Sequence, residues 1–124
     1  MIPVVVDASV WLDLFNEADP ARRELAESFF ESVRGMEPLE PALFKVELAG
    51  LLARRFSEET VESVVGSLSA RARIIEDPSD LAYRVALVTG SRAADAYYIA
   101  TAKLTGSILI SNDRRQVDGA RKAG

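Results

Sequence analysis

Four acidic residues in this chain of 124 residues stand where a carboxylate could do chemistry. Asp7 and Asp113 each follow an apolar run that is typical of a buried strand, and Glu47 and Asp95 lie in apolar helical segments. Because ligands bind beyond the carboxyl ends of strands in open α/β sheets, acids at these points could converge on one cleft. Several carboxylates gathered together raise each other's pKa values, and a divalent cation removes that conflict. The pattern therefore predicts an acidic site that binds a cation.

Three of these acids also have a purely structural explanation. Asp7 could cap the helix that begins near Ser9, and Asp95 could interact favourably with the dipole at the start of its helix. Asp113 could belong to a polar surface turn. None of the three is decisive alone.

Glu47 is the most informative of the four. Its helical neighbours three and four residues away offer no cation to pair with: they are Leu43, Phe44, Gly50 and Leu51. A carboxylate beside an apolar stripe needs a partner from elsewhere in the fold, unless its long side chain reaches past the stripe to water. Both explanations stay open at this point.

The composition restricts the chemistry that is available. The sequence contains no cysteine and no histidine, which excludes disulfides, thiolate nucleophiles, Ser-His-Asp catalysis and nearly all zinc and copper sites. Oxygen ligands from Asp and Glu suit the hard cations Mg²⁺ and Mn²⁺. Three neutral residues, Ser9, Ser111 and Asn112, are placed to complete the surroundings of such a cation, although caps and turns would explain them equally well.

The formal net charge of −4 argues mildly against binding nucleic acid through overall charge. Local basic patches could still form around Arg54, Arg55, Arg71, Arg73, Arg92, Arg114 and Arg115. Which of them gather depends on the fold.

The periodicity of apolar residues predicts alternating strands and helices. Strands are expected at 2–6, 37–40, 72–76 and 107–110, and helices at 9–15, 20–33, 41–52, 57–68, 80–88 and 92–104. The expected N-caps are Asp19, Ser57 and Ser91, and Gly90 and Gly106 should end helices. This order favours a single α/β domain over residues 1–124, a three-layer α/β/α sandwich with a mostly parallel central sheet of four or five strands.

No apolar run approaches the roughly 20 residues that span a bilayer. The first residues lack a basic region, and their apolar run stops at Asp7, so they resemble a buried strand and not a signal peptide. We expect a cytoplasmic protein with no membrane partner.

Four segments together resemble the PIN-domain family, and specifically the VapC-type toxins of prokaryotic toxin–antitoxin pairs. They cover residues 5–12, 46–52, 94–102 and 108–113. Each segment is weak evidence alone, but their order and spacing across nearly the whole chain are specific.

The resemblance implies a PIN-like fold and an endoribonuclease that depends on Mg²⁺ or Mn²⁺. It assigns the acidic site to Asp7, Glu47, Asp95 and Asp113, and places Ser9 and Ser111 at the family's small hydroxyl positions. It also implies a homodimer and a VapB-type antitoxin partner that inhibits the enzyme near its active site. PIN domains commonly add an edge strand after the last helix, and residues 120–124 give little sign of one.

The expected reaction is hydrolysis of RNA phosphodiester bonds by water that the metal activates. In this interpretation Asp7, Glu47 and Asp95 bind the metal, and Asp113 binds a second metal or orients water. Three arginines near these segments are candidates for binding the flanking phosphates: Arg92, Arg114 and Arg115.

Other classes of protein fit the sequence less well. A phosphoaccepting signalling receiver, which also has an acidic Mg²⁺ pocket, needs a lysine after a late strand, where this chain has Asn112, Asp113 and Arg114. A phosphatase of the haloacid-dehalogenase type needs a second aspartate where Ser9 stands. A non-catalytic binding protein with the same fold stays open, and a metal titration would separate it from a nuclease.

Overall fold

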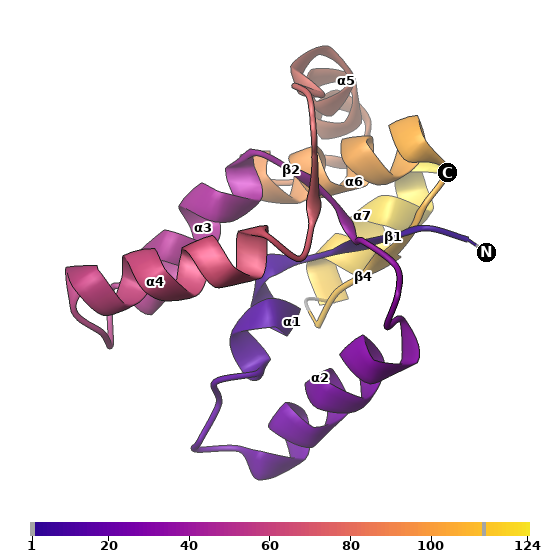
Figure 1. The fold of residues 1–124 in the computed structure, drawn as a ribbon. Helices are drawn as coiled ribbons and strands as arrows, with labels where there is room; N and C mark the ends of the chain where they lie inside the picture. The colour runs from indigo at the N-terminus through magenta and orange to yellow at the C-terminus, as the bar shows by residue number, and fades with distance from the viewer. Residues whose placement is uncertain (1, 113) are drawn as a thin grey trace.

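The computed structural model describes residues 2–112 and 114–124, and the side chains of these residues except 114–116. Its elements follow one another from the N-terminus to the C-terminus as Figure 1 shows. They are β1 (Val4–Val6), α1 (Ala8–Asp13), α2 (Pro20–Ser32), β2 (Leu39–Pro41), α3 (Leu43–Leu52), α4 (Glu58–Ser69), β3 (Arg73–Ile75), α5 (Ser79–Thr89), α6 (Ala93–Thr105), β4 (Ile108–Ile110) and α7 (Arg114–Ala123).

Local sequence chemistry explains several helix boundaries. The Asp19 side chain accepts a hydrogen bond from the Arg22 N–H at the start of α2, and the Ser57 hydroxyl accepts one from the Thr60 N–H at the start of α4. Gly90 and Gly106 end α5 and α6 with φ angles of 70° and 64°, in the left-handed region that glycine tolerates best. These boundaries confirm the prediction.

The predicted cap at Ser91 is wrong. The N-cap of α6 is Arg92, and no side chain makes a capping hydrogen bond there. The Ser91 hydroxyl instead accepts a hydrogen bond of 2.7 Å from the Thr89 hydroxyl at the end of α5. Ser91 therefore belongs to the turn between α5 and α6, where its hydroxyl oxygen accepts from Thr89 instead of capping α6.

All strand pairing among the described residues is parallel, which confirms the α/β class. Strand β1 pairs with β4 in the register Val4–Ile108 to Val6–Ile110, and β2 pairs with β3. Because β1 also contacts β2, the four strands lie in the order β4, β1, β2, β3, with hydrogen-bonded ladders in two separate pairs. After β4 the described part of the chain continues into α7 and contains no fifth strand.

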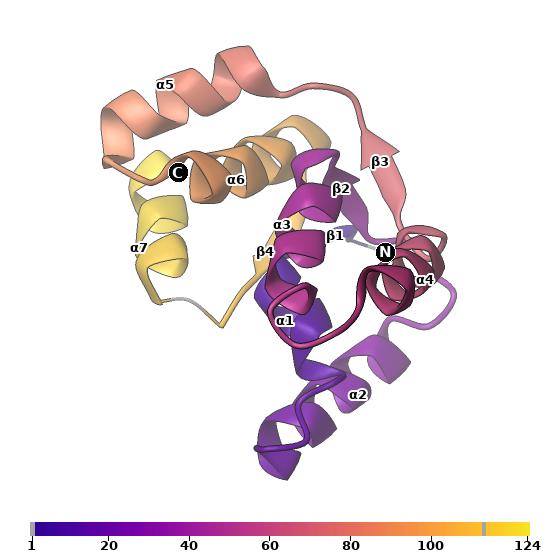
Figure 2. The same ribbon diagram turned by 90° about the vertical axis from the view of Figure 1, so that its left-hand side faces the viewer.

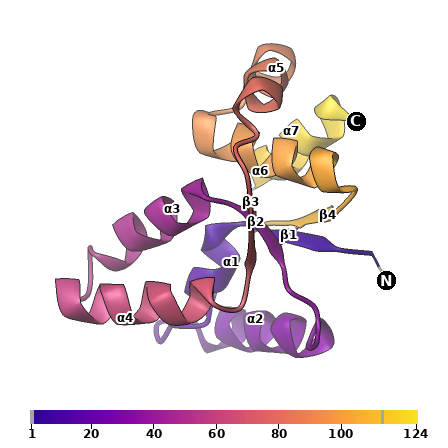
Figure 3. The ribbon, with the colours of Figure 1, turned by 45° about the horizontal axis from the view of Figure 1, so that its top comes forward.

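Helices lie on both sides of the strands. Figure 3 shows helices α1, α2, α3 and α4 on one side and α5, α6 and α7 on the other. Helix α6 packs against β1, β2 and β4, and α5 and α7 pack against α6, as Figure 2 also shows. Strand β1 is therefore covered on both faces, as its uninterrupted apolar sequence predicts.

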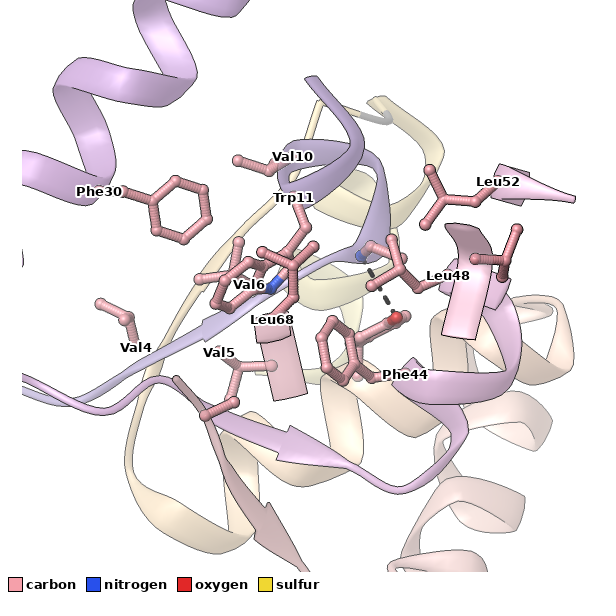
Figure 4. Close-up of a cluster of buried hydrophobic side chains, with 14 residues drawn as sticks. Val4, Val5, Val6, Val10, Trp11, Phe30, Phe44, Leu48, Leu52 and Leu68 are labelled. Atoms are coloured by element: carbon pink, nitrogen blue, oxygen red, sulfur yellow. Dashed lines mark hydrogen bonds between the residues drawn. The ribbon is translucent and has the colours of Figure 1, made fainter. Parts of the chain in front are cut away.

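The main hydrophobic core surrounds β1 and the first turn of α1. Figure 4 shows Trp11 between Phe30 and Phe44, with ring centroids 4.5 Å and 5.5 Å from the indole. Val5 and Val6 of β1 are completely buried beside them. This packing fixes the end of β1, which directly precedes Asp7. None of the helices that the structure describes is long and apolar enough to cross a bilayer.

Candidate active site

Asp7 is held rigidly where β1 passes into α1. Its backbone N–H donates to the Ile110 carbonyl at 2.9 Å, and its side chain caps α1 by accepting from the Ser9 N–H at 3.2 Å. The Ser9 and Ser111 hydroxyls donate to Oδ2 at 3.1 Å and 2.8 Å. Asp7 is only 6% exposed. The capping role and a role in a site are thus compatible, because one carboxylate receives donors from both flanking segments.

Glu47 finds its partner on another helix. The Tyr98 hydroxyl of α6 donates to Glu47 Oε1 at 2.9 Å and accepts a 3.3 Å hydrogen bond from the Ala8 N–H. Burial raises the pKa of Glu47, and the charges of Asp7 and Asp95 raise it further, while the hydrogen bond from Tyr98 opposes the shift. The sequence predicted a partner from elsewhere in the fold but did not identify it.

Asp95 lies in the first turn of α6. Arg92 Nε is 3.8 Å from Asp95 Oδ2, and the arginine side chain is 64% exposed against 16% for the aspartate. An ion pair with one partner so exposed contributes little to stability, because water screens it. Arg92 therefore places a largely exposed positive charge at the rim, close to the acids.

The three acids line one pocket of about 260 Å³. They come from the end of β1, from α3 and from α6, and Ser9 and Arg92 share the lining. The charges of Asp7 and Asp95 both raise the pKa of Glu47, as expected for carboxylates that lie close together. The structure thus brings Asp7, Glu47 and Asp95 together, as the sequence predicted.

The chemistry of these side chains fits a hard divalent cation. Carboxylate oxygens are the ligands that Mg²⁺ and Mn²⁺ prefer, and a cation would offset the burial, and the repulsion by Asp7 and Asp95, that together raise the pKa of Glu47. In the described part of the chain, however, no three acids are grouped tightly enough to hold one metal ion as they stand. The three acids share a pocket without forming a closed ligand set by themselves.

Three other candidates lie outside what the structure describes. Asp113 is one of the residues left out, and the side chains of Arg114 and Arg115 at the start of α7 are not described. Asn112, the residue before Asp113, donates from Nδ2 to Asp13 and not to an acid that lines the pocket.

Glu40 is a buried acid that the sequence analysis did not single out. It is completely buried in β2, where the Trp11 indole N–H donates to Oε2 at 2.7 Å and Oε1 has no hydrogen-bond partner. Burial raises the pKa of Glu40 well above its ordinary range, against the opposing effects of Trp11 and the Val6 backbone; the charge of Asp7 adds to the increase. The reasoning used for Glu47, a carboxylate beside apolar residues with no cation near it in the sequence, also applies to Glu40. It ends the strand predicted at 37–40 and has Leu39 and Pro41 on either side.

The role of Tyr98 was also missed, although a signal was present. Tyr98 is three residues after Asp95, so both project from neighbouring positions on one side of α6. Its hydroxyl is buried, and burial together with the charge of Glu47 raises the pKa of Tyr98, so the group stays a hydrogen-bond donor at neutral pH.

A larger hollow of about 550 Å³ lies elsewhere, between α1, α2 and the end of α4. The Arg71 guanidinium covers its aromatic wall, 5.6 Å from the Trp11 ring and 5.4 Å from the Phe30 ring. It contains none of the acids discussed above. Size alone would favour this hollow, but the converging carboxylates place the candidate site in the smaller pocket.

Comparisons with known proteins agree with this geometry. The sequence model of the PIN domain matches residues 4–122. A chain in the crystal structure of FitAcB from Neisseria gonorrhoeae is similar with a TM-score of 0.70 and 17% identity, over 95% of this chain and 93% of that one. At this identity the likeness shows a shared fold. No protein with a curated description matches the sequence significantly.

The family match covers nearly the whole chain, and the parallel strands and acidic pocket fit it. The chain belongs to the PIN-domain family. Members of this family are generally nucleases that depend on divalent metal ions.

Proposed function

We propose that this protein is a metal-dependent endoribonuclease and the toxin of a VapBC-type toxin–antitoxin pair. The observation that carries the proposal is the pocket lined by Asp7, Glu47 and Asp95, three acids from distant parts of the sequence. Membership of the PIN-domain family supports nuclease chemistry there. RNA as substrate, the VapB-type antitoxin and a homodimer are parts of the proposal that rest on the resemblance to VapC-type toxins.

The proposed metal ligands are Asp7, Glu47 and Asp95, with Asp113 as the fourth acid of the site. A bound Mg²⁺ or Mn²⁺ supplies activation of water and stabilisation of the negative charge that develops on the phosphate. The protein's own contribution is preorganisation. Ser9 and Ser111 fix the orientation of the Asp7 carboxylate.

Glu47 is oriented in the same way from the opposite side. Tyr98 donates to its carboxylate, which keeps one oxygen directed toward α6 and favours the ionised form that a cation requires. In this proposal Arg92 binds a phosphate that flanks the bond to be cut, and the support is its largely exposed side chain beside Asp95.

An RNA cleavage assay with Mg²⁺, Mn²⁺ and EDTA tests the proposal. We expect cleavage that requires the metal and is lost in Asp7→Asn, because an amide is a poorer ligand for a hard cation than a carboxylate. Asp80→Asn, which removes an exposed charge at the start of α5, is the matched control and should keep full activity. Parental activity in Asp7→Asn would contradict the assignment, and binding of metal without any cleavage would favour a non-catalytic protein of the same fold.

A further inference from the structure

Asp13 is a second buried carboxylate on α1, and no metal or catalytic role has been assigned to it. It is the last residue of the helix and is 7% exposed. Asn112 Nδ2 donates to Asp13 Oδ2 at 2.5 Å, and an Arg22 guanidinium nitrogen lies 3.3 Å from the same oxygen. A buried carboxylate requires such donors, because an unpaired charge away from water is costly.

The two partners of Asp13 come from different parts of the fold. Arg22 belongs to the first turns of α2, nine residues further along the chain. Asn112 belongs to the segment that follows β4 and is 99 residues away in sequence. Asp13 therefore connects α1 to α2 on one side and to the end of β4 on the other.

The opposite end of α1 makes an equivalent connection. Asp7, which caps the helix, accepts from the Ser111 hydroxyl at 2.8 Å. Two consecutive residues after β4, Ser111 and Asn112, thus donate to two carboxylates at the two ends of one short helix. Two contacts on adjacent residues restrict both the position and the direction of the chain that leaves β4.

Ser111, the residue before Asn112, is the one whose hydroxyl orients the Asp7 carboxylate of the proposed site. We propose that Asp13 is a positioning residue: through Asn112 it holds the chain after β4 so that Ser111 keeps its hydrogen bond to Asp7. This inference rests on the proposed nuclease function for its catalytic consequence. The connection between Asp13 and Asn112 does not depend on that function.

Arg22 provides a control that separates positioning from general stability. Arg22→Ala removes the ion pair between Asp13 of α1 and α2 but leaves the hydrogen bond between Asp13 and Asn112 in place. Asn112→Ala does the reverse. Asp13→Asn keeps the size of the side chain and one acceptor oxygen, so it serves as the milder variant if Asp13→Ala folds poorly.

The experiment measures RNA cleavage and amide hydrogen exchange on the same set of proteins. We expect Asp13→Ala and Asn112→Ala each to lower kcat by about 10- to 100-fold, because a misplacement of about 1 Å can cost that much, with a smaller change in KM. The double variant should be no worse than either single variant, since both remove one connection. Arg22→Ala should lower the melting temperature without lowering kcat.

Hydrogen exchange makes the result independent of catalysis. The peptide that contains Ser111 and Asn112 should exchange faster in Asp13→Ala and in Asn112→Ala, and at the parental rate in Arg22→Ala. Unchanged exchange in Asp13→Ala overturns the inference whether or not the protein cuts RNA. A parental kcat in Asp13→Ala, in an assay where the parental protein cleaves RNA, overturns it as well. If the parental protein cuts no RNA, the nuclease proposal fails, and faster exchange still supports the positioning of this segment by Asp13.

Discussion

The buried carboxyl of Glu40 should make the stability of this protein depend on pH in a characteristic way. Its pKa in the folded state is raised well above the ordinary value near 4.5, chiefly by burial. The folded state therefore holds a proton that the unfolded state releases. The stabilising contribution of the protonated Glu40 carboxyl is fully present below the pKa of the unfolded state. It is lost as the pH rises toward the pKa of the folded state.

Glu40→Gln should remove this dependence, because the amide keeps the size of the side chain and cannot ionise. Each pH unit between the unfolded and folded pKa values costs the parental protein about 1.4 kcal/mol. At every pH between these two pKa values the variant should therefore gain stability relative to the parental protein as the pH rises, and the gain should stop once the pH exceeds the folded pKa. The glutamine amide N–H would lie where Oε1 has no hydrogen-bond partner. If it stays unpaired, the variant should lose about 1 to 3 kcal/mol of unfolding free energy at every pH.

The assay is urea unfolding of both proteins at several pH values between 5 and 8, in EDTA so that metal binding does not contribute. Glu37→Gln is the matched control: it removes the same charge from an exposed position three residues earlier. The quantity to compare is the slope of the difference in unfolding free energy against pH. Parallel curves for Glu40→Gln and the parental protein would refute the claim that burial raises the pKa of Glu40.

Three further predictions concern contacts around the site. Glu47→Gln should abolish RNA cleavage yet leave the melting temperature in EDTA equal or higher at neutral pH. The reason is that it deletes a carboxylate whose pKa is raised by burial and by neighbouring acids. A variant that is less stable but cuts RNA at the parental rate would show that Glu47 has a structural role. Tyr98→Phe should lower the free energy of unfolding in urea by about 1 to 3 kcal/mol because the Ala8 N–H loses its acceptor. The acid limb of the pH profile of cleavage should also move to higher pH, because Glu47 loses the donor that lowers its pKa. An unmoved acid limb would count against the contact between Tyr98 and Glu47. Gly119→Ala would place a Cβ 2.6 Å from the Ser91 hydroxyl oxygen, so the Ser91 side chain must move, against the gain in helix propensity of alanine over glycine. Ser91→Ala should therefore raise the melting temperature of Gly119→Ala more than it raises that of the parental protein. Equal effects in the two backgrounds would contradict this packing.

The sequence by itself determined the features that depend on near neighbours. The caps at Asp19 and Ser57 and the helix ends at Gly90 and Gly106 follow from interactions within one turn, so they could be predicted. The apolar run before Asp7 likewise predicted a strand buried on both faces. Glu47 could be selected because no cation lies three or four residues away from it on its helix.

Tertiary structure decided which distant residues complete the site. Tyr98 meets Glu47 across 51 positions of sequence, and Asn112 meets Asp13 across 99. No local rule contains such pairs, because they exist only after the helices have packed on both sides of β1. The same holds for Glu40, whose raised pKa comes from burial beneath Trp11, and burial is a property of the packed core rather than of the residues beside it in the chain.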